Sequence, residues 1–120
     1  LGCDVRAIQS DRFAAVRELA ARHSAVVVLK GTGSLVADAQ GQVALCPFGN
    51  PGMASAGMGD VLTGVIAGLL AQGLSTWDAA CLGVLAHARA GDHAAGASPR
   101  GLIASDLFNP LRACLNGVTA

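Results

Sequence analysis

Charged residues are scarce in this sequence. Asp, Glu, Lys and Arg make up 13% of its 120 residues, which is about half of their share in an average soluble domain. The apolar residues reach 52%, and there are 16 glycines. A chain so poor in charge is expected to cover part of its surface with another segment or another subunit. Its length sets one domain as the upper limit.

Three further features are missing. The Lys and Arg residues are scattered and the formal net charge is zero, so no basic stripe is available for nucleic acid. The longest apolar stretch, residues 61–74, is shorter than the ~20 residues that a membrane-spanning helix needs. The cysteines (Cys3, Cys46, Cys81 and Cys114) have no CxxC spacing, which indicates neither a zinc site nor a disulfide framework. We therefore expect a cytoplasmic protein with reduced thiols, no nucleic-acid partner and no membrane segment.

The first part of the chain follows an α/β pattern. Apolar residues recur at helical spacing between residues 10 and 23, which predicts a helix with Ser10 or Asp11 as its cap and Phe13 among its core-facing residues. The β-branched run 25–29 predicts a strand that is buried on both faces. Two short runs, at residues 35–37 and 43–46, flank a turn-rich segment and predict a hairpin.

The rest of the chain is predicted to be helical after a long loop. Residues 47–59 are rich in Gly and Pro, and a loop of this length needs a functional reason. We predict three helices, over residues 60–72, from residue 75 or 76 to residue 90, and from residue 105 or 106 to about residue 115. In the first of them, Gly64 and Gly68 would let a second backbone approach closely. Residues 92–101 show no usable pattern.

Gly57, Gly59 and Asp60 are the residues that point to chemistry. The glycines stand directly before a predicted helix, where backbone N–H groups can converge on an anion at the positive end of the helix dipole. Asp60 falls in the first turn of that helix and could accept a proton from an attacking hydroxyl. The alternative is that the glycines only shape a turn and Asp60 only caps the helix. Neither a Walker A motif nor a GxGxxG fingerprint occurs at this loop.

Residues 50–64, NPGMASAGMGDVLTG, closely resemble the signature of the ADP/ATP-dependent NAD(P)H-hydrate dehydratases, a branch of the ribokinase-like superfamily. Residues 30–34, KGTGS, resemble the nucleotide-contacting KGxG[ST] segment of the family. Residues 67–73, 78–80 and 101–107 also resemble it, so the similarity covers nearly the whole chain. The resemblance implies an α/β fold. Residues 1–120 would be the C-terminal part of one ribokinase-like three-layer α/β/α domain, with buried strands and a hairpin packed against about four helices.

The resemblance also implies an activity. With Mg²⁺, the terminal phosphoryl group of ADP or ATP would pass to the 6-hydroxyl of (S)-NAD(P)H hydrate, and phosphate would then leave to restore NAD(P)H. Asp60 would be the catalytic base and contact the substrate, while Gly57 and Gly59 would bind phosphate through their amides. The nucleotide would be contacted by Lys30, Gly31, Thr32, Gly33 and Ser34. No residue of this chain is predicted to bind a metal directly.

Other interpretations of single residues stay open. Lys30 could be only the polar end of a strand. His87, in the middle of a predicted helix, fits a packed histidine better than a ligand. Arg89, Asp92 and Arg100 could contact a nucleotide or could equally be solvated.

Domains of this family are more than twice as long as this chain. The resemblance therefore implies that the substrate side and the metal-associated acidic residues come from a segment before Leu1. We expect the 120 residues alone to have little or no dehydratase activity. The resemblance also implies that the complete protein forms a homo-oligomer, because members of the family commonly form homo-tetramers. Two other functions remain: a small-molecule kinase of the same superfamily, acting on a sugar or vitamin, and a non-catalytic assembly module.

Overall fold

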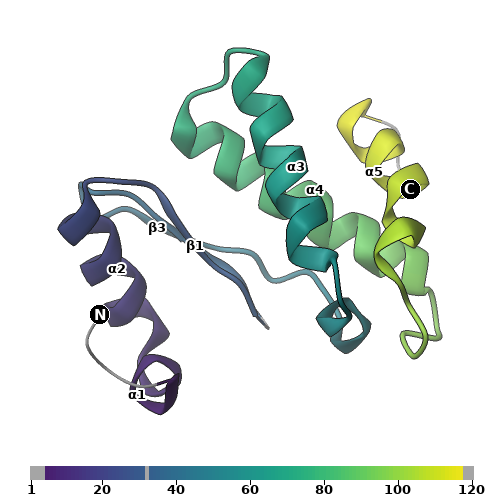
Figure 1. Cartoon of the computed structure of the whole chain (residues 1–120), viewed down its shortest axis with the longest axis horizontal. Helices are drawn as coiled ribbons and strands as arrows, with labels where there is room; N and C mark the ends of the chain where they lie inside the picture. Colours follow the sequence, from purple (N-terminus) through teal and green to yellow (C-terminus); the bar gives the residue numbers. More distant parts are fainter. Residues whose placement is uncertain (1–4, 32, 118–120) are drawn as a thin grey trace. The chain divides into compact units, whose positions relative to one another are not determined.

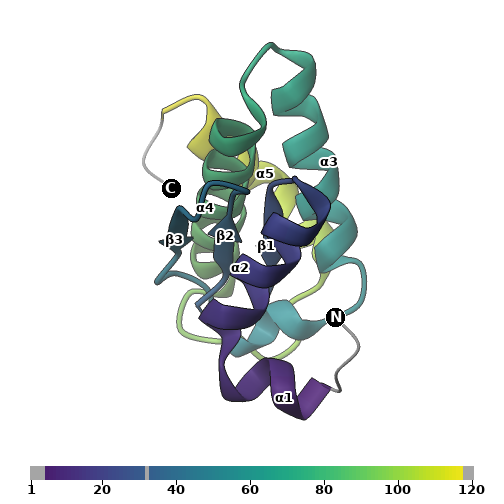
Figure 2. The ribbon, with the colours of Figure 1, turned by 90° about the vertical axis from the view of Figure 1, so that its left-hand side faces the viewer.

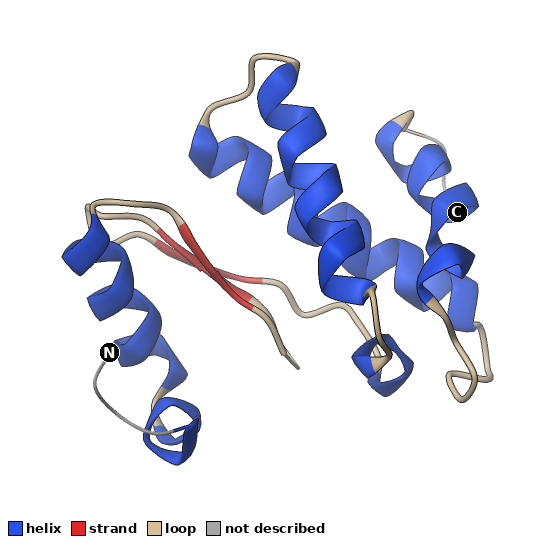
Figure 3. Ribbon diagram, in the orientation of Figure 1, coloured by secondary structure: helices blue, strands red, loops and turns tan. Residues whose placement is uncertain are grey.

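The structure, a computed structural model, describes residues 5–31 and 33–117. The chain divides into two compact units, the N-terminal unit Leu1–Cys46 and the C-terminal unit Pro47–Ala120. Each unit has its own cluster of buried apolar side chains. Strands occur in the described part of the N-terminal unit, whereas the C-terminal unit is helical (Figure 1, Figure 3).

The N-terminal unit consists of two helices and a small sheet. In order these are α1 (Val5–Ser10), α2 (Arg12–His23), β1 (Val27–Leu29), β2 (Leu35–Ala37) and β3 (Val43–Leu45). Asp11 caps α2, because its side chain accepts a hydrogen bond from the amide of Ala14. Helix α2 covers one face of the strands (Figure 2), and Val16, Ala20, Leu35 and Ala37 form the core between them.

The sheet is antiparallel throughout its described strands, in the order β1-β2-β3. The hairpin predicted from residues 35–46 is confirmed, since β2 pairs with β3. Asp38 closes its turn by accepting hydrogen bonds from the amides of Gln40 and Gln42, at 3.0 and 2.8 Å. These two hydrogen bonds from the turn amides to the Asp38 carboxylate stabilise the turn of this short hairpin.

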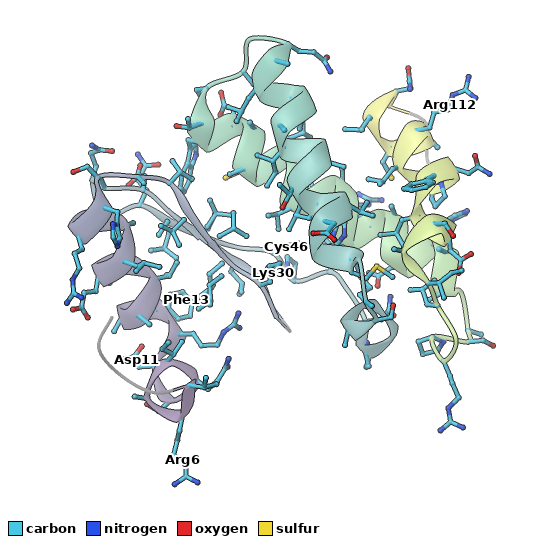
Figure 4. The ribbon with its side chains drawn as sticks, in the orientation of Figure 1. Arg6, Asp11, Phe13, Lys30, Cys46 and Arg112 are labelled. Atoms are coloured by element: carbon cyan, nitrogen blue, oxygen red, sulfur yellow. The ribbon has the colours of Figure 1, made fainter. Side chains whose placement is uncertain are left out.

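The predictions for the strand over residues 25–29 and for Phe13 in the helix before it were wrong. The strand predicted over residues 25–29 is limited to β1, which is half-buried rather than buried on both faces. The reason is that β1 lies at the edge of the sheet, where β2 is its only described neighbour and α2 covers one face. Phe13, expected to face the core, is 47% exposed (Figure 4).

The C-terminal unit is built on one long helix. Its elements are η1 (Pro51–Ala54), α3 (Met58–Ala71), α4 (Thr76–Ala95), η2 (Ala104–Leu107) and α5 (Phe108–Leu115). Helix α4 packs against both α3 and α5. A core cluster forms around it from Met58, Ala86, Ala90, Ala95, Leu102, Leu107 and Leu111. The start predicted for α4 at residue 75 or 76 is confirmed, and Ser75 caps the helix by accepting a hydrogen bond from the amide of Asp78.

The helix boundaries differ from the prediction in two places. Helix α4 continues to Ala95, into the segment without a recognisable pattern, and ends at Gly96. The last predicted helix is split, since the short 3-10 helix η2 precedes α5. Asp106 accepts from the amide of Ile103 and so closes the start of η2 instead of capping α5.

Close backbone packing occurs at other glycines than those predicted. A Cβ atom added at Gly64 or Gly68 would meet nothing within 4 Å. A Cβ at Gly83 of α4 would instead lie 2.6 Å from Cγ1 of Ile66 in α3. The close contact between the two helices therefore depends on a glycine of α4. Among the described helices, none has both the length and the apolar character needed to cross a membrane.

Candidate functional site

The start of α3 is the centre of the predicted phosphate site. Gly57 is its N-cap and has φ 85° and ψ −9°, a left-handed conformation that glycine adopts without strain. Helices α2 and α4 are capped by the side chains of Asp11 and Ser75, but no side chain of the described residues caps α3. The first amides of a helix have no carbonyl one turn earlier, so they can bind an anion that approaches along the helix axis.

Asp60 is the third residue of α3 and lies in its first turn, as predicted. Gly59 is the second helical residue and does not have a positive φ, so only Gly57 shapes the turn. The side chain of Asp60 is exposed. A carboxylate at this position is accessible to a substrate that binds next to the helix start, and it can accept a proton there.

Two contacts hold this helix start in place. Met58 is 4% exposed and belongs to the core cluster. Its carbonyl oxygen lies 3.0 Å from Nε2 of the buried His87 in α4. A carbonyl oxygen can only accept, so Nε2 of His87 carries the proton and donates it. His87 is thus a packed histidine, as predicted, and it also anchors the residue between Gly57 and Gly59.

The segment before α3 is fixed as well. The hydroxyl of Ser55 donates to the carbonyl oxygen of Leu102 at 2.9 Å. A Cβ atom added at Gly57 would lie 3.3 Å from the Cβ atom of Ala104. Residues 102–104 therefore pack closely against this loop, which leaves little room to change Gly57.

The other predicted segment lies in the N-terminal unit. Lys30 directly follows β1 and is exposed (Figure 4), and Gly31 and Gly33 have φ 152° and 69°. The hydroxyl of Ser34 lies 3.3 Å from the amide and 3.2 Å from the carbonyl oxygen of Gly31. Lys30, Gly31, Gly33 and Ser34 are thus brought together in the turn between β1 and β2. Thr32 lies outside the described residues.

Sequence reasoning did not identify Arg12 as a residue of this turn. From α2, its Nη1 atom donates to the carbonyl oxygen of Gly33 at 3.0 Å, and its Nη2 atom to those of Leu29 and Lys30 at 3.2 and 3.4 Å. One guanidinium group therefore donates hydrogen bonds to carbonyl groups at both ends of the turn. In the sequence Arg12 looks like any other charged residue of a helix, and no local signal distinguishes it.

No cluster of three or more His, Cys, Asp and Glu residues that could hold a metal ion is found within residues 5–31 and 33–117. The cysteines within these ranges, Cys46, Cys81 and Cys114, are free thiols. The candidate groups are the backbone amides at the start of α3 and the carboxylate of Asp60 in the C-terminal unit, and the turn that Arg12 contacts in the N-terminal unit.

The chain is similar to known proteins over nearly its full length. It is 55% identical over 117 residues to a bifunctional NAD(P)H-hydrate repair enzyme of Vibrio cholerae, covering 97% of this chain and 24% of that protein. It is 43% identical over 122 residues to an ADP-dependent (S)-NAD(P)H-hydrate dehydratase of Neisseria meningitidis, covering 99% of this chain and 41% of that protein. The chain thus spans about a quarter of the length of the first relative and about two fifths of that of the second.

A solved structure has the same fold. The ADP/ATP-dependent NAD(P)H-hydrate dehydratase of Bacillus subtilis, co-crystallised with ATP and Mg²⁺, matches with a TM-score of 0.90 and 30% identity, over 97% of this chain and 42% of that chain. The α/β fold class predicted from the sequence is therefore confirmed. The sequence profile of one family, described as NAD(P)H-hydrate dehydratase, matches residues 1–112. Because this match covers more than half of the chain, the chain belongs to the NAD(P)H-hydrate dehydratase family.

Proposed function

We propose that this chain supplies the phosphate-binding helix start and the catalytic base of a nucleotide-dependent (S)-NAD(P)H-hydrate dehydratase. The observation that supports this most directly is the start of α3. There a left-handed glycine replaces the usual side-chain cap, and an exposed carboxylate follows three residues later. Amides without acceptors and a nearby proton acceptor are the two groups that phosphoryl transfer to a hydroxyl requires.

The reaction would proceed in two steps. Asp60 accepts the proton of the 6-hydroxyl while that oxygen attacks the terminal phosphorus of ADP or ATP, and AMP or ADP leaves. Amides at the start of α3, around Gly57 and Gly59, donate hydrogen bonds to the phosphoryl oxygens, a type of contact whose loss costs about 3 kcal/mol in enzymes where it has been removed. The lone pair of the ring nitrogen then expels phosphate from C6, and loss of a proton from C5 restores the dihydronicotinamide.

The turn at residues 30–34 would contact the nucleotide. Gly31 and Gly33 have positive φ in this turn, and Lys30 supplies an exposed positive charge next to them. The described residues contain no acidic cluster for Mg²⁺. In the proposed reaction Mg²⁺ would bind with the nucleotide phosphates, where it would neutralise their charge.

The substrate side of the site would come from a longer chain. Relatives extend well beyond the matched region, and this chain exposes large apolar side chains, among them Leu70, Leu82 and Leu85. Such side chains fit contacts with further segments of the domain or with other subunits of a homo-oligomer. The free thiols fit a reducing compartment, and we place the protein in the cytoplasm.

Calorimetric titration of ADP, ATP and AMP into the intact protein, with Mg²⁺ present, tests the site. Binding should be lost in Gly59→Val, because the branched side chain occupies the space next to the first amides. Asp60→Asn should retain binding and lose turnover of NAD(P)H hydrate, because it keeps the size of the side chain and removes the base. Gly68→Ala is the matched control, since it changes an open glycine of the same helix.

The outcomes separate the alternatives. Nucleotide binding with turnover of a sugar or vitamin, and none of NAD(P)H hydrate, would assign the protein to the small-molecule kinases. Absence of nucleotide binding in the intact protein would favour an assembly module and contradict the proposal. Equal loss of binding in Gly59→Val and Gly68→Ala would mean that α3 tolerates no change, not that Gly59 borders a phosphate.

A further inference from the structure

Asp92, near the C-terminal end of α4, has both carboxylate oxygens engaged by the segment that leads to the glycine helix start. Its Oδ2 atom accepts a hydrogen bond from the amide of Gly49 at 2.9 Å. Its Oδ1 atom accepts from Nδ2 of Asn50 at 2.9 Å. The partners are 42 and 43 positions away in the sequence, so these bonds fix tertiary structure and not the helix itself. Asp92 is half-buried and is not simply solvated.

Asn50 connects Asp92 to the next residues of the segment, because its side chain bonds to both Asp92 and Gly52. Its Oδ1 atom accepts from the amide of Gly52 at 3.0 Å, which caps η1. A Cβ atom added at Gly52 would lie 2.2 Å from the carbonyl oxygen of Pro99, so the backbone cannot move toward that side. Because a carboxylate only accepts, the amide nitrogen of Asn50 faces Asp92 and its oxygen faces Gly52.

Helix α4 contacts the rest of the same segment. A Cβ at Gly91 would lie 2.3 Å from the sulfur of Met53, which shows how closely Met53 approaches the helix. His87, one turn before Gly91, binds the carbonyl oxygen of Met58. Arg89 lies with its Cζ atom 5.4 Å from the centre of the Phe48 ring. Residues 87–92 of α4 therefore contact residues 48–58 at several points along that segment. Asp92 bonds to Gly49 and Asn50, near the start of the segment.

We propose that Asp92 is a positioning residue for the phosphate-binding helix start. By fixing Gly49 and Asn50, it sets the path of residues 49–57 and hence the place of the Gly57 and Gly59 amides. The assignment of those amides to phosphate binding rests on the proposed function. Asp92 itself contacts neither nucleotide nor substrate in this role.

The chemistry of the contact makes it testable by exchange of two side chains. Asp92 receives two donors, so Asp92→Asn turns an NH₂ group toward one of them and loses at least one bond. If Asn50→Asp is added, the amide introduced at position 92 can accept from Gly49 and donate to the carboxylate introduced at position 50. That carboxylate can still accept from the amide of Gly52. The double variant thus keeps every hydrogen bond and the net charge, with the carboxylate moved from one position to the other.

The first measurement is the affinity for ADP with Mg²⁺, in the intact protein. We expect Asp92→Asn to weaken binding about tenfold, because charge-assisted hydrogen bonds are lost. The double variant should recover most of this loss, whereas Asn50→Asp alone should not bind normally, since two carboxylates then face each other. Asp78→Asn is the matched control, because it removes an exposed carboxylate from the first turn of the same helix.

The second measurement does not depend on nucleotide. The ¹H–¹⁵N resonances of the Gly57 and Gly59 amides should shift in Asp92→Asn and return toward their original positions in the double variant. If the parent binds no nucleotide but these shifts occur and are reversed, the proposed function fails and the positioning role stands. Unchanged Gly57 and Gly59 resonances in a folded Asp92→Asn protein would overturn the positioning role, as would a double variant that recovers neither the affinity nor the resonances.

Discussion

Gly57→Ala is the substitution whose effect can be worked out most fully from the structure. It adds one methyl group at the N-cap of α3, where φ is 85° and ψ is −9°. A residue with a Cβ atom is less stable than glycine in this left-handed conformation by about 1–2 kcal/mol. The new Cβ would also lie 3.3 Å from the Cβ atom of Ala104, which is closer than ordinary van der Waals contact.

The free-energy cost of the added methyl group must lower either the free energy of unfolding or the affinity for ADP. If residue 57 keeps its conformation, the free energy of unfolding falls by about 1–2 kcal/mol. If the loop relaxes, the amides move away from the phosphate and the affinity for ADP falls instead, by about 5- to 30-fold for the same free energy. Urea unfolding and calorimetric titration of the intact protein measure the two effects. Addition of Ala104→Gly removes the steric part and leaves the part due to φ.

Gly68→Ala provides the comparison on the same helix. Gly68 lies in the interior of α3 with no atom within 4 Å of an added Cβ, so alanine should stabilise the helix by about 0.5–1 kcal/mol. If Gly57→Ala is as stable as the parent and binds ADP equally well, the left-handed glycine is not required. The description of the phosphate site given above would then be refuted.

Three other predictions follow from single residues and from the extent of the chain. Arg12→Ala should lower the free energy of unfolding by about 2 kcal/mol, because three carbonyl groups lose a charged donor. Urea unfolding measures this, and Arg12→Lys should recover only part of it. Burial, and then the charge of Asp78, raise the pKa of the Cys81 thiol. The thiolate fraction at a given pH is therefore reduced, so iodoacetamide should modify Cys81 slowly at about pH 8, and Asp78→Asn should speed the reaction by lowering the pKa. Mass spectrometry of the peptide follows this reaction, and an unchanged rate would contradict the electrostatic cause. Residues 1–120 alone, which span 24% of the Vibrio cholerae relative, should show little or no turnover of NAD(P)H hydrate when the recovery of dihydronicotinamide absorbance is followed. Turnover at the rate of a complete enzyme would refute this.

The sequence by itself determined the features that depend on neighbouring residues. Asp11, one of the two predicted caps, caps α2, and α4 starts after Ser75 as predicted, because a cap needs only a side-chain oxygen and an amide two or three residues later. The turn between β2 and β3 was predictable for the same reason, since its residues bond to one another. Asp60 lies in the first turn of α3, and the resemblance of residues 50–64 to one family implied the role that we propose for it.

Tertiary structure decided what depends on partners far along the chain. The β-branched residues of β1 suit a strand, but the pairing of β1 with β2 and the single covered face left it half-buried. Gly64 and Gly68 have the spacing for close helix packing, yet the position of α4 places the contact at Gly83. Arg12 and Asp92 bond to groups about 20 and 40 positions away, so no local pattern could distinguish them from surface charges. A hydrogen bond of that kind exists only after the chain has folded, because folding alone brings its donor and acceptor together.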